Sequence, residues 1–423
     1  MLDLKQIREN PEAVKAGIAT KNDKSDIDAI LEMDANRREL IKQGEALKGE
    51  RNRASAEIGK KKKAGEPADE AVAAMREVGQ KIASLDKQLR EIDDKLRKAL
   101  AWIPNLPHKD APVGVDESTN VVVRTWGEIP KRDFKVLPHW EVGEKLGILD
   151  LAAGARISGS GFFVLRGLGA RLQRALISYM LDMHTADGFV EYTVPYVVTT
   201  DTMFGTGQLP KLEEDMYKTA CEDDDLFLIP TGEVPLTNIF KQQILDYQQL
   251  PVYMVTHTPC FRREAGAAGK DTRGMMRVHQ FDKVELVKIV RPETSYDEHD
   301  SLTAQAEKVL QELQLPYRVA DLATGDLSFA AARCYDLELW APGVERWLEI
   351  SSISNFEDFQ ARRMNCRFRD ENKKVLFPHT INGSGVALAR LIPAILENYQ
   401  NEDGTVTIPE VLCPYMGGAD KIG

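Results

Sequence analysis

A seven-residue repeat of apolar side chains over residues 78–99 is the feature that most constrains how this chain folds. Its spacings alternate between four and three, which places one narrow apolar stripe along a helix, as in coiled coils. The members of the stripe are Val78, Ile82, Leu85, Leu89, Ile92, Leu96 and Ala99. We therefore expect a long helix here that packs against a second helix.

The upstream sequence provides a partner for this helix. Met33, Leu40, Leu47 and Ala54 recur every seven residues in an equally charged stretch, and GKKKKAGEP at 59–67 separates the two patterns with Gly and Pro. An antiparallel helical hairpin follows from this order. Helices of about 35 residues would each be about 50 Å long at a rise of 1.5 Å per residue, so we expect an arm that extends into solvent.

A proline-rich stretch at 102–112 separates the arm from the rest of the chain. The 423 residues exceed the size at which one hydrophobic core stops growing. We therefore predict an N-terminal helical domain at 1–110 and a larger second domain at 111–423.

The second domain is predicted to be of the α+β class. Runs rich in β-branched residues occur at 121–126, 162–165, 190–198, 283–290 and 346–354, with amphipathic helices predicted near 166–186, 234–246 and 297–313. This order favours an antiparallel or mixed sheet over a doubly wound parallel one, in which strands and helices alternate strictly.

The charge of the chain is unevenly distributed. Its net charge is −11, yet residues 37–98 contain 17 basic and 12 acidic residues, a local balance of +5 that leaves −16 for the remainder. A basic segment suits a nucleic-acid partner, because phosphates are neutralised by Lys and Arg. Two helices with solvated, Lys-rich faces remain the alternative at this point.

The apolar runs and the cysteines indicate where the protein works. No run approaches the roughly 18 apolar residues of a membrane span, so we expect no membrane partner. The five cysteines are odd in number and far apart, which predicts neither a disulfide framework nor a CxxC metal site. A cytoplasmic protein is the expectation.

Residues 260–290 carry the first chemical signal. The segment has strand-like ends around a long loop, and long loops in compact domains tend to be functional. Near Glu264 it gathers five cations, Arg262, Arg263, Lys270, Arg273 and Arg277. Converging cations suit a polyphosphate, although a solvated hairpin with self-neutralising charges would share this composition.

The second signal is NGSGVALARLIPAILENYQ at 382–400, where a turn of small residues opens an amphipathic helix that carries Arg390. A helix N-terminus offers free N–H groups and a partial positive charge to an anion. The glycines form neither a P-loop nor a GxGxxG fingerprint. Taken alone, they also fit a tight entry into a helix.

Together these segments resemble the seryl-tRNA synthetase family of class II aminoacyl-tRNA synthetases. Phe261-Arg262-Arg263-Glu264 with Arg273, Arg277 and His279-Gln280-Phe281 resembles motif 2, Gly383-Ser384-Gly385 through Arg390 resembles motif 3, and the helix and strand at 174–195, ending at Pro195, resemble motif 1. Thr231-Gly232-Glu233 is similar to the serine-binding TxE element, and Glu349-Ile350-Ser351-Ser352 to a further family element. The resemblance spans nearly the whole chain in the family's order.

The resemblance implies an antiparallel sheet flanked by helices, with ATP and Mg²⁺ as cofactors. It implies activation of L-serine to seryl-adenylate and transfer to the 3′ end of a serine tRNA with a long variable arm, which the coiled-coil arm binds. It further implies a homodimer and raises selenocysteine tRNA as a second acceptor.

The resemblance also implies residue roles. Arg262 would hold the α-phosphate and the serine carboxylate, Glu264 and Phe281 the adenine, Arg277 and Arg390 the terminal phosphates, and Glu349 and Ser352 the metal. The implied catalytic residues are Arg262, Glu264 and Arg390. The implied ATP-binding set is Arg262, Arg263, Glu264, Arg277, Val278, Phe281, Glu349, Ile350, Ser351, Ser352 and Arg390. The implied serine-binding set is Thr231, Gly232, Glu233, Arg262, Glu285 and Ser384.

Two positions depart from the family pattern: Arg263 stands where bacterial relatives often have Ser, and Ala389 where Gly is common. In a strand, position 263 should face away from a ligand-facing neighbour. Cys260 and Cys334 could serve the zinc-dependent variety of seryl enzyme, but the TGE element and the bacterial-type arm favour a pocket without zinc.

Two other functions compete with this reading. A synthetase-like ligase that charges a carrier protein would lack the basic arm. A catalytically dead coiled-coil scaffold would be expected to have lost Arg262, Glu264 or Arg390.

Overall fold

The computed structural model describes residues 1–65, 67–220, 225–265 and 273–423. The chain divides into two compact units. The smaller unit comprises residues 2–19 and 23–104, and the larger comprises residue 1, residues 20–22 and residues 105–423. None of the helices formed by the described residues is both long enough and apolar enough to cross a membrane.

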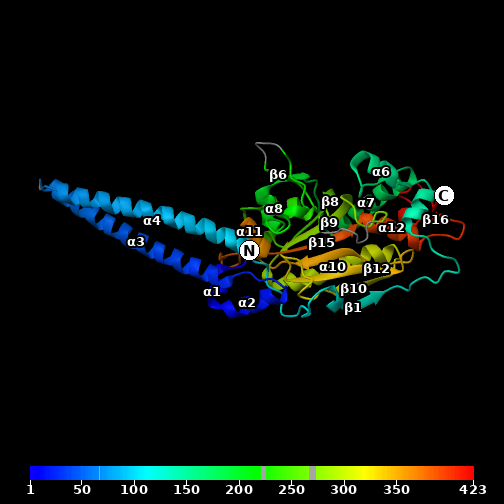
Figure 1. The fold of residues 1–423 in the computed structure, drawn as a ribbon, viewed down its shortest axis with the longest axis horizontal. Coiled ribbons are helices and arrows are strands. Elements are labelled where there is room, and N and C mark those ends of the chain that lie inside the picture. Colours follow the sequence, from blue (N-terminus) through cyan, green and yellow to red (C-terminus); the bar gives the residue numbers. More distant parts are fainter. Residues whose placement is uncertain (66, 221–224, 266–272) are drawn as a thin grey trace. The chain divides into compact units, whose positions relative to one another are not determined.

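The smaller unit is helical. Its elements are α1 (Leu4–Glu9), α2 (Pro11–Thr20), α3 (Ile27–Lys63) and α4 (Asp69–Ala101). Figure 1 shows α3 and α4 side by side as an antiparallel hairpin, here called the arm. α3 begins where the Asp26 carboxylate accepts a hydrogen bond from the Ala29 N–H at 2.9 Å. It ends in Lys60–Lys63, which suits the negative end of the helix dipole.

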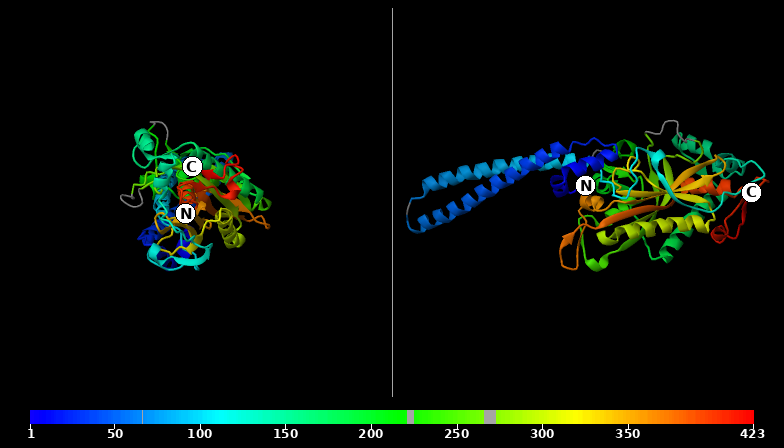
Figure 2. Two further views of the ribbon diagram at one scale, coloured as in Figure 1. Left: turned by 90° about the vertical axis from the view of Figure 1, so that its right-hand side faces the viewer. Right: turned by 90° about the horizontal axis from the view of Figure 1, so that it is seen from below.

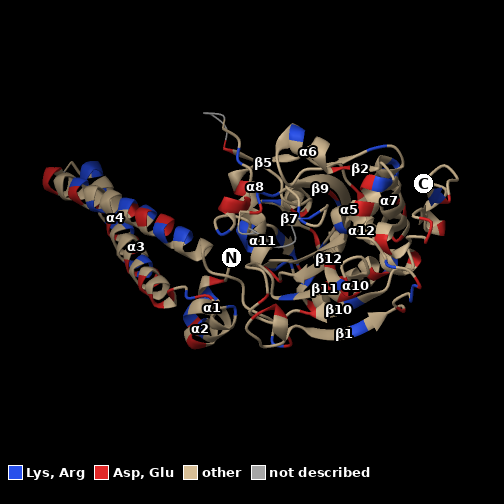
Figure 3. Ribbon diagram, turned by 45° about the vertical axis from the view of Figure 1, so that its right-hand side comes forward, with Lys and Arg blue, Asp and Glu red and all other residues tan. Residues whose placement is uncertain are grey.

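The predicted apolar stripe forms the seam between the two helices of the arm. Ile82 and Leu96 are buried, and the other five members of the α4 stripe are half-buried, as are the four stripe residues of α3. Arg37 pairs with Asp93 at 2.5 Å across the seam. Figure 3 shows cations along both helices, interleaved with acidic residues. The coiled-coil prediction is thereby confirmed.

An eight-stranded sheet organises the larger unit, in the order β1-β10-β11-β12-β15-β9-β8-β4. In that order the strands are Val121–Trp126, Tyr317–Asp321, Arg333–Ala341, Arg346–Asn355, His379–Ala387, Gln280–Val290, Val252–Phe261 and Val190–Glu191. All neighbours are antiparallel except β4 and β8. The predicted α+β class with a largely antiparallel sheet is confirmed.

Three helices cover this sheet and build the core. They are α7 (Leu168–Ala186), α10 (Ser295–Glu312) and α12 (Leu388–Asn398). Figures 1 and 2 show α10 lying along the sheet. Apolar residues of all three helices share one cluster with Val284 and Leu286 of β9. α12 buries every residue except Arg390, so that one cation stands out from an apolar helix.

Shorter elements complete the larger unit. The helices are α5 (His139–Lys145), α6 (Leu151–Ser158), α8 (Thr200–Thr206), α9 (Glu233–Thr237) and α11 (Phe359–Met364). The strands are β2 (Leu149–Asp150), β3 (Val164–Leu165), β5 (Val197–Thr199), β6 (Leu226–Leu228), β7 (Ile244–Leu245), β13 (Arg367–Arg369), β14 (Val375–Leu376), β16 (Val406–Thr407) and β17 (Lys421–Ile422).

Three predicted elements were wrong in extent. In the run at 162–165, only Val164–Leu165 forms a strand. The run at 190–198 forms two short strands in different sheets, because Pro195 between them cannot donate a ladder hydrogen bond. The helix predicted at 234–246 ends at Thr237. There the Asn238 side chain donates to the Val234 carbonyl at 2.9 Å, competing with the backbone bond of a longer helix.

Candidate active site

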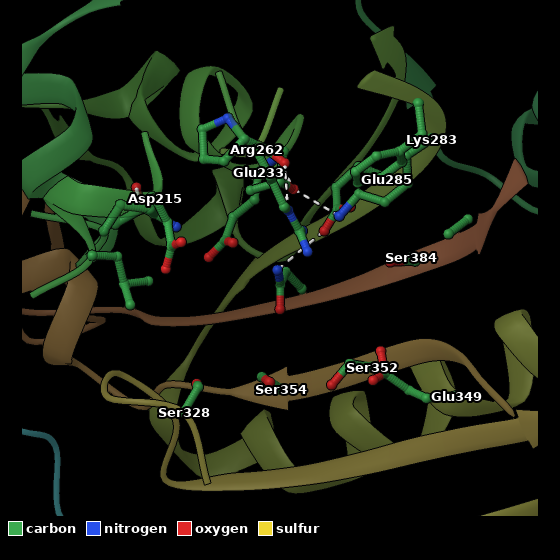
Figure 4. A pocket seen from close by; sticks show the side chains of 18 of the residues that line it. Asp215, Glu233, Arg262, Lys283, Glu285, Ser328, Glu349, Ser352, Ser354 and Ser384 are labelled. Atoms are coloured by element: carbon green, nitrogen blue, oxygen red, sulfur yellow. Dashed lines mark hydrogen bonds and ion pairs between the residues drawn. The ribbon is translucent and has the colours of Figure 1, made fainter. Parts of the chain in front are cut away.

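A cavity of about 570 Å³ lies over β9, β12 and β15, and the residues after β8 enter it. Figure 4 shows side chains from these strands pointing toward one another across it. Segments 206–216 and 328–330 supply further walls. Residues far apart in the sequence therefore meet in one place.

Strand alternation explains why β9 contributes several polar groups. Phe281, Lys283 and Glu285 line the cavity, while Val284 and Leu286 are buried in the core on the opposite face. One strand thus separates the apolar core from the site.

One end of the cavity holds two acids and a cation. The buried Lys283 ammonium donates to Thr231 Oγ1 at 2.7 Å and forms an ion pair with Glu285. Asn382 Nδ2 donates to the same carboxylate at 3.1 Å. Burial, together with the negative charge of Glu285, raises the pKa of Glu233 to about 7. This end suits a small ligand that carries both a cationic and a hydroxyl group.

Arg262 lies between the acids and the open part of the cavity. Its Nε donates to the Pro230 carbonyl at 3.2 Å, and the guanidinium carbon is 5.2 Å from the centre of the Phe281 ring. The planar group is thereby oriented while further N–H donors remain. A guanidinium of this kind can bind a carboxylate or a phosphate in bidentate fashion.

Two more arginines line the cavity. Arg277 Nη1 lies 3.4 Å from Glu264 Oε2, and Arg390 Nη1 lies 3.4 Å from Glu349 Oε1. Each cation has a carboxylate neighbour that an anionic ligand could displace. The arrangement suits a phosphate chain.

A β-bulge brings Glu349 and Ser352 to the same side of β12. Residues three apart in a regular strand face opposite sides, but Leu337 pairs with Ser351 while Glu338 pairs with Glu349, which leaves Ile350 as an extra residue. Glu349 on one side of the bulge and Ser352 on the other therefore both line the cavity.

The oxygen donors near Ser352 fit Mg²⁺. Ser352 Oγ donates to Asp336 Oδ1 at 2.6 Å, and burial, with the nearby Glu349 charge, holds the pKa of Asp336 well above its usual range. A divalent cation would offset the repulsion between these carboxylates. Mg²⁺ typically binds one or two carboxylates together with substrate phosphates.

Cys260 and Cys334 are buried free thiols. Burial raises the pKa of both Cys260 and Cys334. Within the described parts of the chain, no group of three or more His, Cys, Asp and Glu side chains is arranged to hold a metal ion.

Most residues singled out in the sequence line the cavity. They are Thr231, Glu233, Arg262, Glu264, Arg277, Val278, Phe281, Glu285, Glu349, Ile350, Ser352, Ser384 and Arg390. Ala389 lines it as well. Lys270 lies outside the described residues.

Gly232, Arg263 and Ser351 are not among the lining residues. A Cβ on Gly232 would lie 2.9 Å from Thr256 Cγ2, so the missing side chain permits close packing on β8. Ser351 is buried and donates to the Ser384 carbonyl at 2.6 Å. Arg263 is exposed beside a shallow depression that contains Glu213 and Glu214.

His139 of α5 holds the chain between β8 and β9 at Met275. The His139 ring bonds Glu397 of α12 at 2.9 Å through Nδ1, and its Nε2 accepts the Met275 N–H at 3.0 Å. Arg273 lies outside the cavity, with its guanidinium carbon 5.3 Å from the centre of the Trp140 ring. Gly274 leaves room for the His139 ring, because a Cβ on residue 274 would lie 2.2 Å from His139 Nε2.

Several lining or supporting residues were missed in the sequence. Lys283 could have been found by alternation, since it stands two residues from Glu285 on the same strand face. Gln208, Asn382 and the supporting Gln360 come from segments that carry no local signal.

Family models match both parts of the chain. Residues 1–107 match the seryl-tRNA synthetase N-terminal domain. Residues 217–399 match the tRNA synthetase class II core domain (G, H, P, S and T).

Among curated proteins, the serine–tRNA ligase of Desulfitobacterium hafniense is 54% identical over 418 residues, covering 99% of each chain. That of Carboxydothermus hydrogenoformans is 52% identical over 424 residues, covering 100% of this chain and 99% of its own.

Solved structures give the same picture. The seryl-tRNA synthetase of Pyrococcus horikoshii complexed with ATP superposes with a TM-score of 0.93 at 41% identity, covering 100% of this chain and 99% of its own. The cytoplasmic serine–tRNA ligase of Naegleria fowleri in complex with AMP has a TM-score of 0.89 at 29% identity, covering 100% and 98%.

Proposed function

The chain belongs to the seryl-tRNA synthetase family, and we propose that it activates L-serine with ATP and transfers the serine to the 3′ end of serine tRNA. The observation that carries this proposal is that one cavity is lined by the buried Glu233 and Glu285 and by the arginines Arg262, Arg277 and Arg390. Serine tRNA is the principal acceptor, and selenocysteine tRNA is a further one.

Two displacements make up the proposed reaction. A serine carboxylate oxygen attacks the α-phosphorus of ATP, the bond to pyrophosphate breaks, and seryl-adenylate forms. A ribose hydroxyl of the terminal tRNA adenosine then attacks the seryl carbonyl, and AMP leaves. Reactions of this type depend on positioning and charge stabilisation, which the fixed guanidinium of Arg262 provides at the reacting phosphate.

We assign serine binding to Thr231, Gly232, Glu233, Glu285 and Ser384, together with Arg262 for the carboxylate. Gly232 acts through its close packing on β8. A site that hydrogen-bonds a substrate hydroxyl rejects analogues without one far better than an apolar pocket rejects an extra methyl group. Alanine and glycine are therefore rejected by unpaired polar groups.

We assign ATP to the other end of the cavity. Glu264, Val278 and Phe281 form the adenine site, and Arg277 and Arg390 bind the terminal phosphates. We assign Ile350 and Ser351 to the ATP site as well. Ser351 acts there through its hydrogen bond to the Ser384 carbonyl. The exposed Arg263 is left without a contact to the nucleotide.

Mg²⁺ fits beside the phosphate end, where Glu349 and Ser352 would hold it with Asp336 behind them. When bound, the ion neutralises phosphate charge. In the two proposed displacements, the protein side chains position the substrates.

We assign tRNA binding to residues 1–110 and catalysis to residues 111–423. The +5 arm suits the phosphate backbone of a tRNA with a long variable arm, since RNA helices are recognised by shape and backbone contacts. We place the protein in the cytoplasm, where tRNA is charged. The free thiols of Cys260, Cys334, Cys366 and Cys413 suit that reducing compartment.

Amino-acid-dependent exchange of pyrophosphate into ATP tests the proposed function. Assayed across all twenty amino acids, exchange is expected with serine and not with alanine or glycine. A serine-charged tRNA product separates this function from that of a ligase acting on a carrier protein. Exchange with another amino acid in place of serine would overturn the proposal.

A symmetric homodimer is expected, because 174–195 resembles the interface motif of class II synthetases. Light scattering should give about twice the 47.3 kDa chain mass. A fully active monomer would contradict the assignment of 174–195 as motif 1.

A further inference from the structure

Gln360 is a buried amide behind the serine end of the cavity. It lies on α11 with 1% of its surface exposed and does not line the cavity itself. Its Nε2 donates to Glu233 Oε1 at 2.7 Å and to the Thr206 carbonyl at 3.0 Å. Its Oε1 accepts from Thr380 Oγ1 at 2.7 Å.

The surroundings fix which way this amide points. A carboxylate and a carbonyl can only accept hydrogen bonds, so the nitrogen must face Glu233 and Thr206. The Thr380 hydroxyl then donates to the remaining oxygen. All three bonds of the amide are satisfied in one orientation, which makes Gln360 a rigid link.

The link joins two walls of the cavity that are distant in sequence. Glu233 begins α9, and Thr206 ends α8, with Gly207 and Gln208 continuing along the cavity. Among the described residues, no other side chain donates to the Glu233 carboxylate. The buried cation Lys283 is bonded to Thr231 and Glu285.

The charge state of Glu233 depends on the same bond. Burial and the charge of Glu285 raise the pKa of Glu233, the hydrogen bond from Gln360 lowers it, and the resulting pKa is about 7. Lys283 and Arg262 also face Glu233 and lower its pKa. A variant without the donor would hold more of Glu233 in the protonated form at neutral pH.

We propose that Gln360 is a positioning residue for serine recognition, which orients the Glu233 carboxylate and holds the 206–208 wall against it. This inference rests on the proposed function. Gln360 acts through Glu233 and touches no substrate atom, so its loss should weaken serine binding while leaving the ATP end of the cavity intact.

The test is Gln360→Met, which keeps side-chain length and removes both donors and the acceptor. In pyrophosphate exchange we expect the KM for serine to rise at least tenfold and the KM for ATP to change less than twofold. The matched control is Thr380→Val, which removes a bond on the far side of the same amide and should change the KM for serine less than threefold.

A pH profile adds a readout that a merely structural role would not move. In the wild type the KM for serine should rise as the pH falls below about 7, because protonation removes the carboxylate acceptor. In Gln360→Met this rise should begin at higher pH. Gln360→Leu serves if the Met variant fails to fold, since it also removes the donor and leaves no charge.

The outcomes distinguish a failure of the positioning role of Gln360 from a failure of the proposed function. Equal increases in the KM values for serine and ATP, or equal effects of Gln360→Met and Thr380→Val, would overturn the positioning role and leave the proposed function standing. Absence of serine-dependent exchange in the wild type would overturn the proposed function and this inference with it.

Discussion

Replacing Arg262 with alanine is expected to abolish serine-dependent pyrophosphate exchange. The guanidinium is held by the Pro230 carbonyl and the Phe281 ring, and we propose that it contacts the reacting phosphate from this position. A charge-assisted bond at that phosphate strengthens in the transition state, and its loss lowers the rate of chemistry. Exchange above about a tenth of the wild-type rate, a loss smaller than roughly 1.4 kcal/mol, would contradict this role.

Arg263→Ser is the matched control, since it removes an arginine from the adjacent position. Arg263 is exposed beside Glu213 and Glu214 and does not line the cavity. We expect exchange within about twofold of the wild type. A loss comparable to that of Arg262→Ala would mean that the two positions share a ligand.

Deleting residues 30–98 and closing the gap with a short glycine linker is expected to separate the two half-reactions. All cavity residues lie between Thr206 and Arg390, so pyrophosphate exchange should stay within a few-fold of the wild type. Aminoacylation of tRNA should fall by orders of magnitude, because the remaining chain carries a charge of −14 and repels the RNA.

Changing Lys60–Lys63 together to alanine should produce a smaller loss of aminoacylation that depends steeply on salt. If the arm instead stabilised a dimer, its deletion would harm both activities equally and yield monomers. Equal losses would therefore remove the tRNA-binding assignment.

The arm was predictable because its information is local. A seven-residue period fixes which face of each helix is buried, and the residues chosen on that basis, such as Ile82 and Leu96, lie in the seam. The antiparallel class was likewise predictable from the order of strand-like and helix-like segments. The helix expected at 234–246 failed because a single side chain, Asn238, competes for a backbone carbonyl.

The site was predictable in part, for a related reason. Strand alternation places Glu285 on the cavity side of β9, and the same argument would have found Lys283. Alternation separates Glu349 from Ser352, and only the bulge opposite Leu337 and Glu338 brings them together. Gln360 reaches Glu233 across 127 positions of chain, a relation that no periodicity encodes.

The antiparallel hairpin of α3 and α4 also has a consequence for chain continuity. Its helices are held by contacts along the seam and by pairs such as Arg37 with Asp93, whereas Ala64 and Gly65 after α3 are exposed. Loop tips of this kind tolerate nicking and insertion. The polypeptide could therefore be severed after Lys63 and expressed as two fragments, whose reassociation along α3 and α4 would serve as a reporter for complementation.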